Sequence, residues 1–346
     1  MNIQPKVSVV VLNWNGKHFL EKFLPSVLQS SYPNLEIYVA DNASTDDSVS
    51  FLKQTYPQIN IILNKANLGF AAGYNQALSE IDSDYFVLLN SDVEVSRAWI
   101  EPVIRLMEAD SKIAAAQPKI KDWNKRSLFE YAGAAGGFLD RFGYPFCRGR
   151  IFDSREEDFG QYNTATEIFW ASGAAFFIKK SAWDFASGFD ADFFAHMEEI
   201  DLCWRLKNLG YTIAYCPDAE VYHIGGGTLQ TDSPFKTYLN FRNNLFMLLK
   251  NLKNDKLFQI LFLRFWLDLI SLLKFLSEGK FQHVIAINKA HIHFFRDYRK
   301  NKRKRITDYS AFTRQGLFEG SIVWQYFAKG KKTFPDICKK EFDSDF

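Results

Sequence analysis

Two acidic segments and one histidine in this 346-residue chain have the residue types and spacing that chemistry requires. The first segment is Asn90-Ser91-Asp92, which directly follows an apolar run. Hard divalent cations prefer oxygen ligands and bridge diphosphates. If a nucleotide binds here, Asp92 is therefore expected to hold such a cation. Asn90 could then make a supporting contact or a contact to the ribose.

The second segment is Glu198-Glu199-Ile200-Asp201, with three carboxylates in four residues. As part of an ordinary helix, these acids complement the positive end of the helix dipole, and Asp201 pairs on the surface with Arg205. As part of a site, one of them is a general base within hydrogen-bond reach of the proton it takes. The residues alone leave both interpretations open.

His223 ends another apolar run, before the glycines at 225–227. A single histidine is more often structural than a ligand. Its place at the end of a run and before a glycine stretch suits a metal ligand or a phosphate contact.

Four expected strands, at 7–12, 36–40, 59–63 and 85–89, are followed by polar residues or glycine. Expected helices between the strands indicate a mostly parallel sheet with helices on both faces. Ligands of such sheets bind beyond the carboxyl ends of the strands. A shared site is therefore expected for the residues that follow these strands: Asn13, Asn15, Asp41, Ser44, Asn64, Asn67, Gly69, Asn90, Ser91 and Asp92.

Common phosphate-binding motifs are missing from this part of the sequence. No GxxxxGK[ST] motif occurs, and no GxGxxG follows the first strand. A P-loop NTPase and a dinucleotide-binding fold are therefore disfavoured. The four cysteines form no CxxC pair, which argues against a zinc ribbon or a disulfide framework.

The rest of the chain divides into three expected parts. A short fifth strand is expected at 114–117, and residues 121–165 look irregular and mobile. The alternation then resumes, with strands at 169–178 and 211–215 and helices at 181–186 and 197–209. From 238 to 302 the pattern is helical. The expected organisation is a catalytic domain over 1–235 and a basic, apolar helical region over 236–346.

Charge supports this division. Residues 1–235 carry 20 Lys and Arg against 30 Asp and Glu, whereas residues 236–306 carry 16 against 4. The apolar run at 256–276 is interrupted by Arg264, Asp268 and Lys274, and a membrane span needs about 20 apolar residues. Two interpretations remain: a helical hairpin packed on the domain, or an interfacial helix aided by the basic run 296–305 on anionic lipid. Nucleic acid is disfavoured because no recognised module accompanies that run.

The N-terminus has no basic segment followed by an apolar segment and a cleavage site, so no secretory signal is expected. The expected location is the cytoplasm, at the inner face of the cell membrane.

Six segments, in order, resemble one family. They are VSVVVLNWNG, VADNASTDDS, NKANLGFAAGYNQAL, FVLLNSDVEV, WASGAAFFIKKSAWDFASGFDADFFAHMEEIDLCWRLKNLGY and AEVYHIGGGT. Together they resemble the inverting nucleotide-sugar glycosyltransferases of family 2, over about residues 5–300. The match is to the rhamnosyltransferase-like branch. The resemblance implies an α/β GT-A fold, which is Rossmann-like with a mostly parallel sheet flanked by helices.

The resemblance also implies site roles. Asn90-Ser91-Asp92 stands at the family's DxD motif, so Asp92 would hold Mn²⁺ or Mg²⁺ against the diphosphate, and His223 would be a metal or diphosphate ligand. Glu198-Glu199 stands at the family's Glu-Asp pair, whose second residue is the general base. The other implied contacts are Val11, Asn13, Asn15, Asn90 and Ser91 for the nucleotide, Asp41 for the pyrimidine, Asn67 and Gly69 for the donor base and sugar, Trp170 and Gly173 for the acceptor side, and Asp201 and Arg205 for the donor and acceptor pocket.

Two departures from the family pattern bear on the chemistry. Asn90 replaces the first Asp of DxD, which leaves one carboxylate for the metal. Glu199 replaces the usual Asp and is one methylene longer, which leaves the choice of base between Glu198 and Glu199 open.

The implied reaction is a single displacement, in which the acceptor hydroxyl loses its proton to Glu199 and attacks the anomeric carbon. The branch and the Asn-Leu-Gly-Phe element favour dTDP-L-rhamnose, with a UDP-sugar as the other donor. The acceptor would be a saccharide or a lipid-linked saccharide in surface polysaccharide synthesis, at an anionic membrane surface. The alternative is a catalytically inactive sugar-nucleotide-binding scaffold of an assembly complex.

Overall fold

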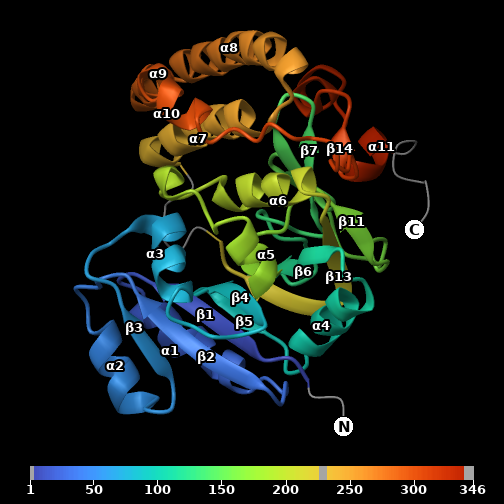
Figure 1. The fold of residues 1–346 in the computed structure, drawn as a ribbon. Coiled ribbons are helices and arrows are strands. Elements are labelled where there is room, and N and C mark those ends of the chain that lie inside the picture. Colours follow the sequence, from blue (N-terminus) through green and yellow to red (C-terminus); the bar gives the residue numbers. More distant parts are fainter. Residues whose placement is uncertain (1–3, 226–231, 339–346) are drawn as a thin grey trace.

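A nine-stranded mixed sheet forms the centre of the computed structural model, which describes residues 4–225 and 232–338 (Figure 1). Four neighbouring strands run parallel in the order β3-β2-β1-β4. On the other side of β4, the antiparallel β12 separates it from β6 and β13. The sheet strands are β1 (Val7–Asn13), β2 (Leu35–Asp41), β3 (Asn60–Leu63), β4 (Tyr85–Asn90), β5 (Val93–Val95), β6 (Ile113–Asp122), β11 (Thr166–Ile168), β12 (Ala175–Lys179) and β13 (Thr212–His223).

Helices cover both faces of this sheet, because its central strand β1 is mostly apolar and is buried on both faces. Val9 and Val11 of β1 pack in one core cluster with α1 (Lys17–Leu28) and α4 (Ile100–Ala109). Val10, which points the opposite way, packs in the other cluster with α3 (Gly69–Leu78). The remaining helices of this part are α2 (Ser48–Thr55), α5 (Lys180–Phe185), the 3₁₀ turn η1 (Ala191–Phe193) and α6 (Glu198–Asn208). The expected α/β architecture is confirmed.

Residues 121–165 are not irregular, and this expectation was wrong. They supply four strands of a second sheet, in the order β10-β9-β8-β7-β14. Its strands are β7 (Gly137–Asp140), β8 (Pro145–Cys147), β9 (Arg150–Ile151), β10 (Ser154–Arg155) and β14 (Leu317–Phe318). Each has only two to four residues. Strands this short are below the length at which alternation can be recognised.

Two strands of the main sheet are longer than expected, and the extra length of β13 positions a candidate site residue. The strand expected at 211–215 continues to His223, with a register shift between Cys216 and Glu220. Pro217 lies in that shifted stretch, and a proline normally argues against a central strand. Similarly, the strand expected at 114–117 runs from Ile113 to Asp122.

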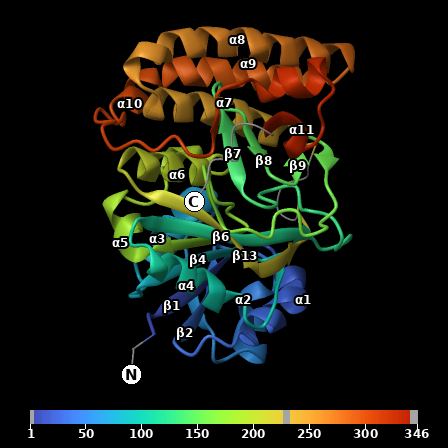
Figure 2. The same ribbon diagram turned by 90° about the vertical axis from the view of Figure 1, so that its right-hand side faces the viewer.

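The expected helical region is confirmed, and its helices lie on the side of α6 away from the main sheet (Figure 2). They are α7 (Pro234–Asn251), α8 (Asn254–Ser277), α9 (Phe281–Arg296) and α10 (Tyr298–Lys302), followed by the π-helical turn η2 (Trp324–Ala328) and α11 (Phe334–Cys338). Leu245–Leu249 of α7 share one core cluster with residues of the main sheet. The boundary at 235/236 therefore lies within a continuous core, and a functional division there stays a prediction.

No helix within residues 4–225 and 232–338 combines the length and hydropathy needed to cross a bilayer.

Candidate active site

The ends of β1 and β2 bring the first group of expected residues together. Asn13 and Asp41 are paired in the parallel register. The Asn13 side-chain amide donates to Asp41 Oδ1 at 3.0 Å and to Ser44 Oγ at 3.2 Å. The Ser44 backbone amide donates to Asp41 Oδ2 at 2.8 Å, and that of Asn15 donates to Ser44 Oγ at 2.9 Å. Both oxygens of Asp41 therefore have donors, which fixes the carboxylate that is expected to meet a pyrimidine.

Asn42, a polar residue of the same strand end to which the sequence gave no role of its own, organises the next group. Its amide donates to Asn67 Oδ1 at 3.1 Å and to the Gly69 carbonyl at 3.0 Å. Its Oδ1 accepts from the Asn64 amide at 3.0 Å and from the Leu68 backbone at 3.2 Å. This one buried amide thus joins the end of β2 to the loop that carries Asn67 and Gly69. The only available signal was its position next to Asp41.

Asp92 and His223, 131 residues apart, meet because β5 pairs with the end of β13. His223 Nε2 lies 3.1 Å from Asp92 Oδ1 and 3.5 Å from the Asn90 amide, and His223 Nδ1 lies 3.3 Å from Glu130 Oε1. Burial alone would lower the pKa of His223, but the carboxylates of Asp92 and Glu130 outweigh it and raise this pKa to about 10. Glu130 was missed because no pattern surrounds it in 121–165.

The Asp92–His223 pair has the donor types that Mn²⁺ and Mg²⁺ sites use, a carboxylate oxygen and an imidazole nitrogen, the latter more typical of Mn²⁺. In the described part of the chain, no group of three or more His, Cys, Asp and Glu side chains is arranged to hold a metal. A cation here would therefore need its other ligands from a diphosphate and water. The residues fit a metal that binds together with its nucleotide. The glycine run after His223 extends into residues 226–231, which lie outside the described residues.

Glu198 and Glu199 begin α6, and one carboxylate oxygen of each is buried without a hydrogen-bond partner. Burial raises the pKa of Glu199 to about 7. Burial and the neighbouring Glu199 raise the pKa of Glu198 well above its usual value. The site itself therefore disfavours a charge on either carboxylate.

Glu130, beside His223, and the candidate base Glu199 both act on one buried thiol of the second sheet. Burial raises the pKa of the Cys147 thiol, on β8, to about 12, and the carboxylates of Glu130 and Glu199 add to this rise. The two carboxylates therefore lie within electrostatic range of the same side chain.

A turn with left-handed backbone precedes Glu198 and Glu199. Phe194, His196 and Met197 have φ values of 66°, 68° and 72°. Each such residue costs about 1–2 kcal/mol relative to ordinary helical backbone. Gly69 touches this turn, since a Cβ added to it would lie 2.6 Å from the Phe194 carbonyl oxygen. Gly69, which is expected to contact the donor, is therefore also required for the packing of the turn before Glu198 and Glu199.

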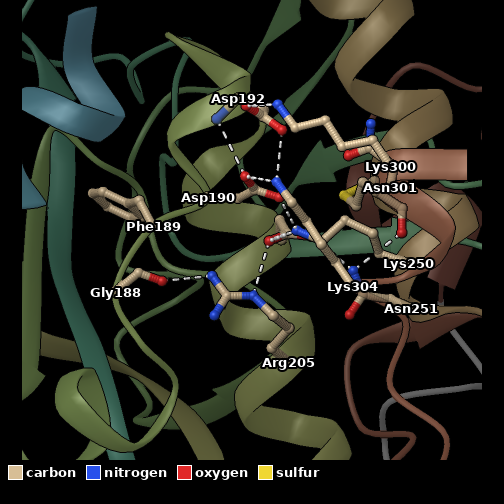
Figure 3. Close-up of polar contacts among 12 residues, drawn as sticks. Gly188, Phe189, Asp190, Asp192, Arg205, Lys250, Asn251, Lys300, Asn301 and Lys304 are labelled. Carbon is tan, nitrogen blue, oxygen red and sulfur yellow. Dashed lines mark hydrogen bonds and ion pairs between the residues drawn. The ribbon is translucent and has the colours of Figure 1, made fainter. Parts of the chain in front are cut away.

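Asp201 and Arg205 do pair, at 2.9 Å, but Asp201 is fully buried rather than on the helix surface. Asp201 also accepts from Lys250 at 2.8 Å and from the Asn251 amide at 2.8 Å, both on α7 (Figure 3). The Arg205 guanidinium donates to the Gly188 carbonyl at 2.6 Å. These contacts hold α6 against its neighbours, so Asp201 and Arg205 stabilise the packing of this helix. A part in the donor and acceptor pocket stays a prediction.

Three other expected site residues lie in packed surroundings. Val11 is buried in the core, so its side chain is not accessible to a nucleotide and only its backbone could contact one. Trp170 donates from Nε1 to the Phe138 carbonyl at 2.9 Å and packs on Gly137. Gly173 faces Phe70, whose ring would lie 3.2 Å from an added Cβ. Their roles toward nucleotide and acceptor stay predictions.

Comparison with known proteins agrees with this arrangement. The model of "Glycosyl transferase family 2" matches residues 8–182. An N-acetylglucosaminyl-diphospho-decaprenol L-rhamnosyltransferase of Mycobacterium tuberculosis is 24% identical over 229 residues, which cover 62% of this chain and 75% of that protein.

Solved structures share the fold at low sequence identity. A GalNAc-T7 structure with UDP, GalNAc and Mn²⁺ has a TM-score of 0.54 at 16% identity, covering 72% of this chain and 48% of the other. A mannosyltransferase from Pyrobaculum calidifontis with GDP-Man and Mn²⁺ has a TM-score of 0.51 at 15% identity, covering 86% and 76%. The family model covers half of the chain. The chain belongs to glycosyl transferase family 2, in its rhamnosyltransferase-like branch.

Proposed function

We propose that this glycosyltransferase transfers L-rhamnose from dTDP-L-rhamnose to a lipid-linked saccharide, with inversion, in surface polysaccharide synthesis. The observations that carry the proposal are the buried Glu198–Glu199 pair at the start of α6 and the separate Asp92–His223–Glu130 group at the end of β13. A base and a separate diphosphate site are the two parts that a single displacement needs. The rhamnosyltransferase relative supports the donor and the acceptor class.

The residues divide the work as follows. Asp41 and the Asn13–Ser44 group hold the nucleotide base. Asp92 and His223 would hold Mn²⁺ or Mg²⁺, which when bound neutralises charge on the leaving diphosphate. Glu199 takes the proton of the acceptor hydroxyl. Burial and the neighbouring Glu199 raise the pKa of Glu198, so in this assignment Glu198 is the protonated member of the pair and Glu199 the ionised one.

A donor panel tests this function directly. With Mn²⁺ present, the protein is expected to release dTDP from dTDP-L-rhamnose and to release little UDP from UDP-glucose or UDP-galactofuranose. Release of nucleotide diphosphate and its loss on chelation are the measurements. Turnover of a UDP-sugar with dTDP-L-rhamnose inert would overturn the donor. Binding of every donor without turnover would favour an inactive scaffold.

We also propose that the protein acts on the inner face of the cell membrane, held by α8 and α9. In α8, unlike in an ordinary surface helix, a charged pair is buried and large apolar side chains are exposed. Its charged residues Arg264 and Asp268 are buried and paired at 3.1 Å. Its outward face instead exposes large apolar side chains, and α9 continues this surface. These residues, called the apolar face below, are Phe258, Phe262, Trp266, Leu269, Ile270, Leu273, Leu276, Phe281, Ile285, Ile292 and Phe295.

An apolar surface of this kind is typical of a helix lying in the acyl boundary of a bilayer. The inner side of α8 carries the buried Arg264–Asp268 pair, whereas its outer side has no partner in the described residues. The basic run is only partly available to lipid. Lys300 and Lys304 pair with Asp192 and Asp190, and Arg305 donates to the Leu252 carbonyl. Exposed cations of the run include Arg299, Lys302 and Arg303.

Vesicle sedimentation tests the membrane surface. The protein is expected to sediment with vesicles containing anionic lipid, to sediment less with neutral vesicles, and to dissociate partly at high salt, since the Debye length shrinks to roughly 3 Å at 1 M. The double variant Phe262→Gln/Trp266→Gln should bind weakly, whereas Phe159→Gln, an exposed aromatic on another surface, should bind normally. Equal binding to neutral and anionic vesicles would remove the electrostatic part. Absence of binding, with a dimer that the double variant splits, would assign the face to a second copy of the chain.

A further inference from the structure

Apart from one hydrogen bond from the Ala195 backbone to the Phe193 carbonyl at 2.8 Å, the turn at 192–197 that leads into Glu198 and Glu199 is held from outside itself. Three of its residues, Phe194, His196 and Met197, have left-handed backbone. Such backbone persists only where the surroundings fix it. Whatever holds this turn therefore sets the position of the candidate base at the start of α6.

Nearly every carbonyl of the turn has an identified donor. The Phe194 carbonyl accepts from the backbone of Phe70 at 2.7 Å and of Ala71 at 3.1 Å, at the start of α3. The Met197 carbonyl accepts from Asp201 within α6. The remaining four, those of residues 192, 193, 195 and 196, are reached from α7.

Asn243 on α7 supplies most of those donors. Its side-chain amide lies 2.9 Å from the Phe193 carbonyl oxygen, 2.9 Å from that of Ala195 and 2.8 Å from that of His196. Arg242 donates to the Asp192 and Phe193 carbonyls at 2.9 and 3.0 Å. Arg242 also donates to Asn243 Oδ1 at 2.7 Å, which fixes the amide with its NH₂ group toward the turn.

Ion pairs hold the chain on either side of the same turn (Figure 3). Lys250 of α7 bridges Asp190, before the turn, and Asp201, after it, at 2.7 and 2.8 Å. Lys304 pairs with Asp190 at 2.5 Å and with Asp192 at 2.7 Å. The ends of the turn are thus fixed by charge, and its middle is fixed by the Asn243 amide.

We propose that Asn243 is a positioning residue for sugar transfer, whose amide holds the 193–196 backbone so that the Glu199 carboxylate reaches the acceptor hydroxyl. This inference rests on the proposed function, in which Glu199 is the base. Asn243 touches neither donor nor acceptor in this assignment. Its contribution lies in the orientation of the base, so it acts on turnover rather than on donor binding.

A matched pair of substitutions separates positioning from general stability. Asn243→Asp keeps the shape and the acceptor for Arg242 but loses the NH₂ donor. Asn244→Asp makes the same change on the neighbouring residue, which is also buried and whose amide donates to the Gly143 carbonyl at 2.5 Å, away from the turn. Any cost of a buried carboxylate is common to the two variants.

Asn243→Asp is expected to lower kcat by about 10²-fold, the scale of a small misplacement of a catalytic group. Donor KM and the affinity for dTDP with Mn²⁺ should stay near wild type, because those contacts come from β1 and β2. The acid limb of kcat/KM against pH should move to lower pH, since a loosened turn admits water to the Glu198–Glu199 pair. Asn244→Asp should leave the limb in place.

Equal losses in both variants, or a fall in Asn243→Asp without movement of the limb, would reduce Asn243 to a structural residue. If Asn243→Asp does not fold, Arg242→Lys, which removes the guanidinium from two of these carbonyls, provides the same comparison. Failure of this inference is distinguishable from failure of the proposed function. In the first case Glu199→Gln is inactive while Asn243→Asp is normal, and in the second Glu199→Gln itself retains turnover.

Discussion

Glu199→Gln is expected to lower kcat for sugar transfer by at least about 10²-fold, the usual contribution of a general base. Glutamine keeps the shape and hydrogen-bonding capacity of the side chain but cannot take a proton. Donor affinity should change little, because the nucleotide contacts lie at the ends of β1 and β2. The measurements are single-turnover rates and dTDP binding in the presence of Mn²⁺.

The pH dependence has a defined sign. Burial raises the pKa of Glu199 to about 7, and a base works only when ionised. The rate should therefore rise as pH increases through about 7, and fall on the acid side. Because this carboxyl is more acidic in the unfolded chain, the stability of the folded state falls as pH rises from the ordinary glutamate pKa to about 7, and it stays lowered above pH 7. Glu199→Gln should thus raise Tm relative to wild type more at pH 8 than at pH 5.

Glu198→Gln is the matched control. Its parent carboxyl is protonated near neutral pH in the proposed assignment, so the amide should retain most of the turnover. If Glu198→Gln is the inactive variant and Glu199→Gln is active, the base is the first residue of the pair. If both variants transfer sugar normally, neither carboxylate is the base and the displacement mechanism proposed for this site is wrong.

The fold and the polar strand ends were predictable because local patterns carry them. An apolar β-branched run such as 7–12 is typical of a buried strand, and the register of parallel neighbours then places Asn13 beside Asp41. Both ends of α6, expected at 197–209, were predictable to within one residue. The order of the motifs along the chain also identified Asp92 and His223 as candidate metal ligands, although their contact was not known.

What the sequence could not show are contacts that depend on the tertiary arrangement. Glu130 meets His223 only because β13 continues past a proline and a register shift. Asp201 looks like a surface acid at i,i+4 from Arg205, yet it is buried because Lys250 arrives from α7. Likewise, the charges of α8 appeared to interrupt an apolar helix, whereas their burial as a pair is what leaves its exposed face apolar. In each case the deciding partner is distant in sequence.

Asp92→Ala is expected to abolish metal-dependent turnover and the Mn²⁺-dependent part of dTDP affinity, with the fold retained. Asp92 is the carboxylate that faces His223 Nε2 at 3.1 Å, and Asn90, at the first position of the DxD motif, is an amide and cannot replace its charge. His223 with Glu130 would remain, but an imidazole alone is a weak site for a hard cation. Calorimetric titration of dTDP with and without Mn²⁺, beside steady-state rates, measures both effects.

The control is Asp82→Ala, an exposed acid before the opposite end of β4, which should behave as wild type in both titrations. If Asp92→Ala retained near-normal kcat at saturating Mn²⁺, the assignment of Asp92 to the metal would be wrong. If it lost turnover but kept the Mn²⁺-dependent gain in dTDP affinity, the cation would be held elsewhere, and Asp92 would act by orienting His223. Loss of both, with Tm unchanged, is the outcome that ties the cation, the diphosphate and the carboxyl end of β4 to one site.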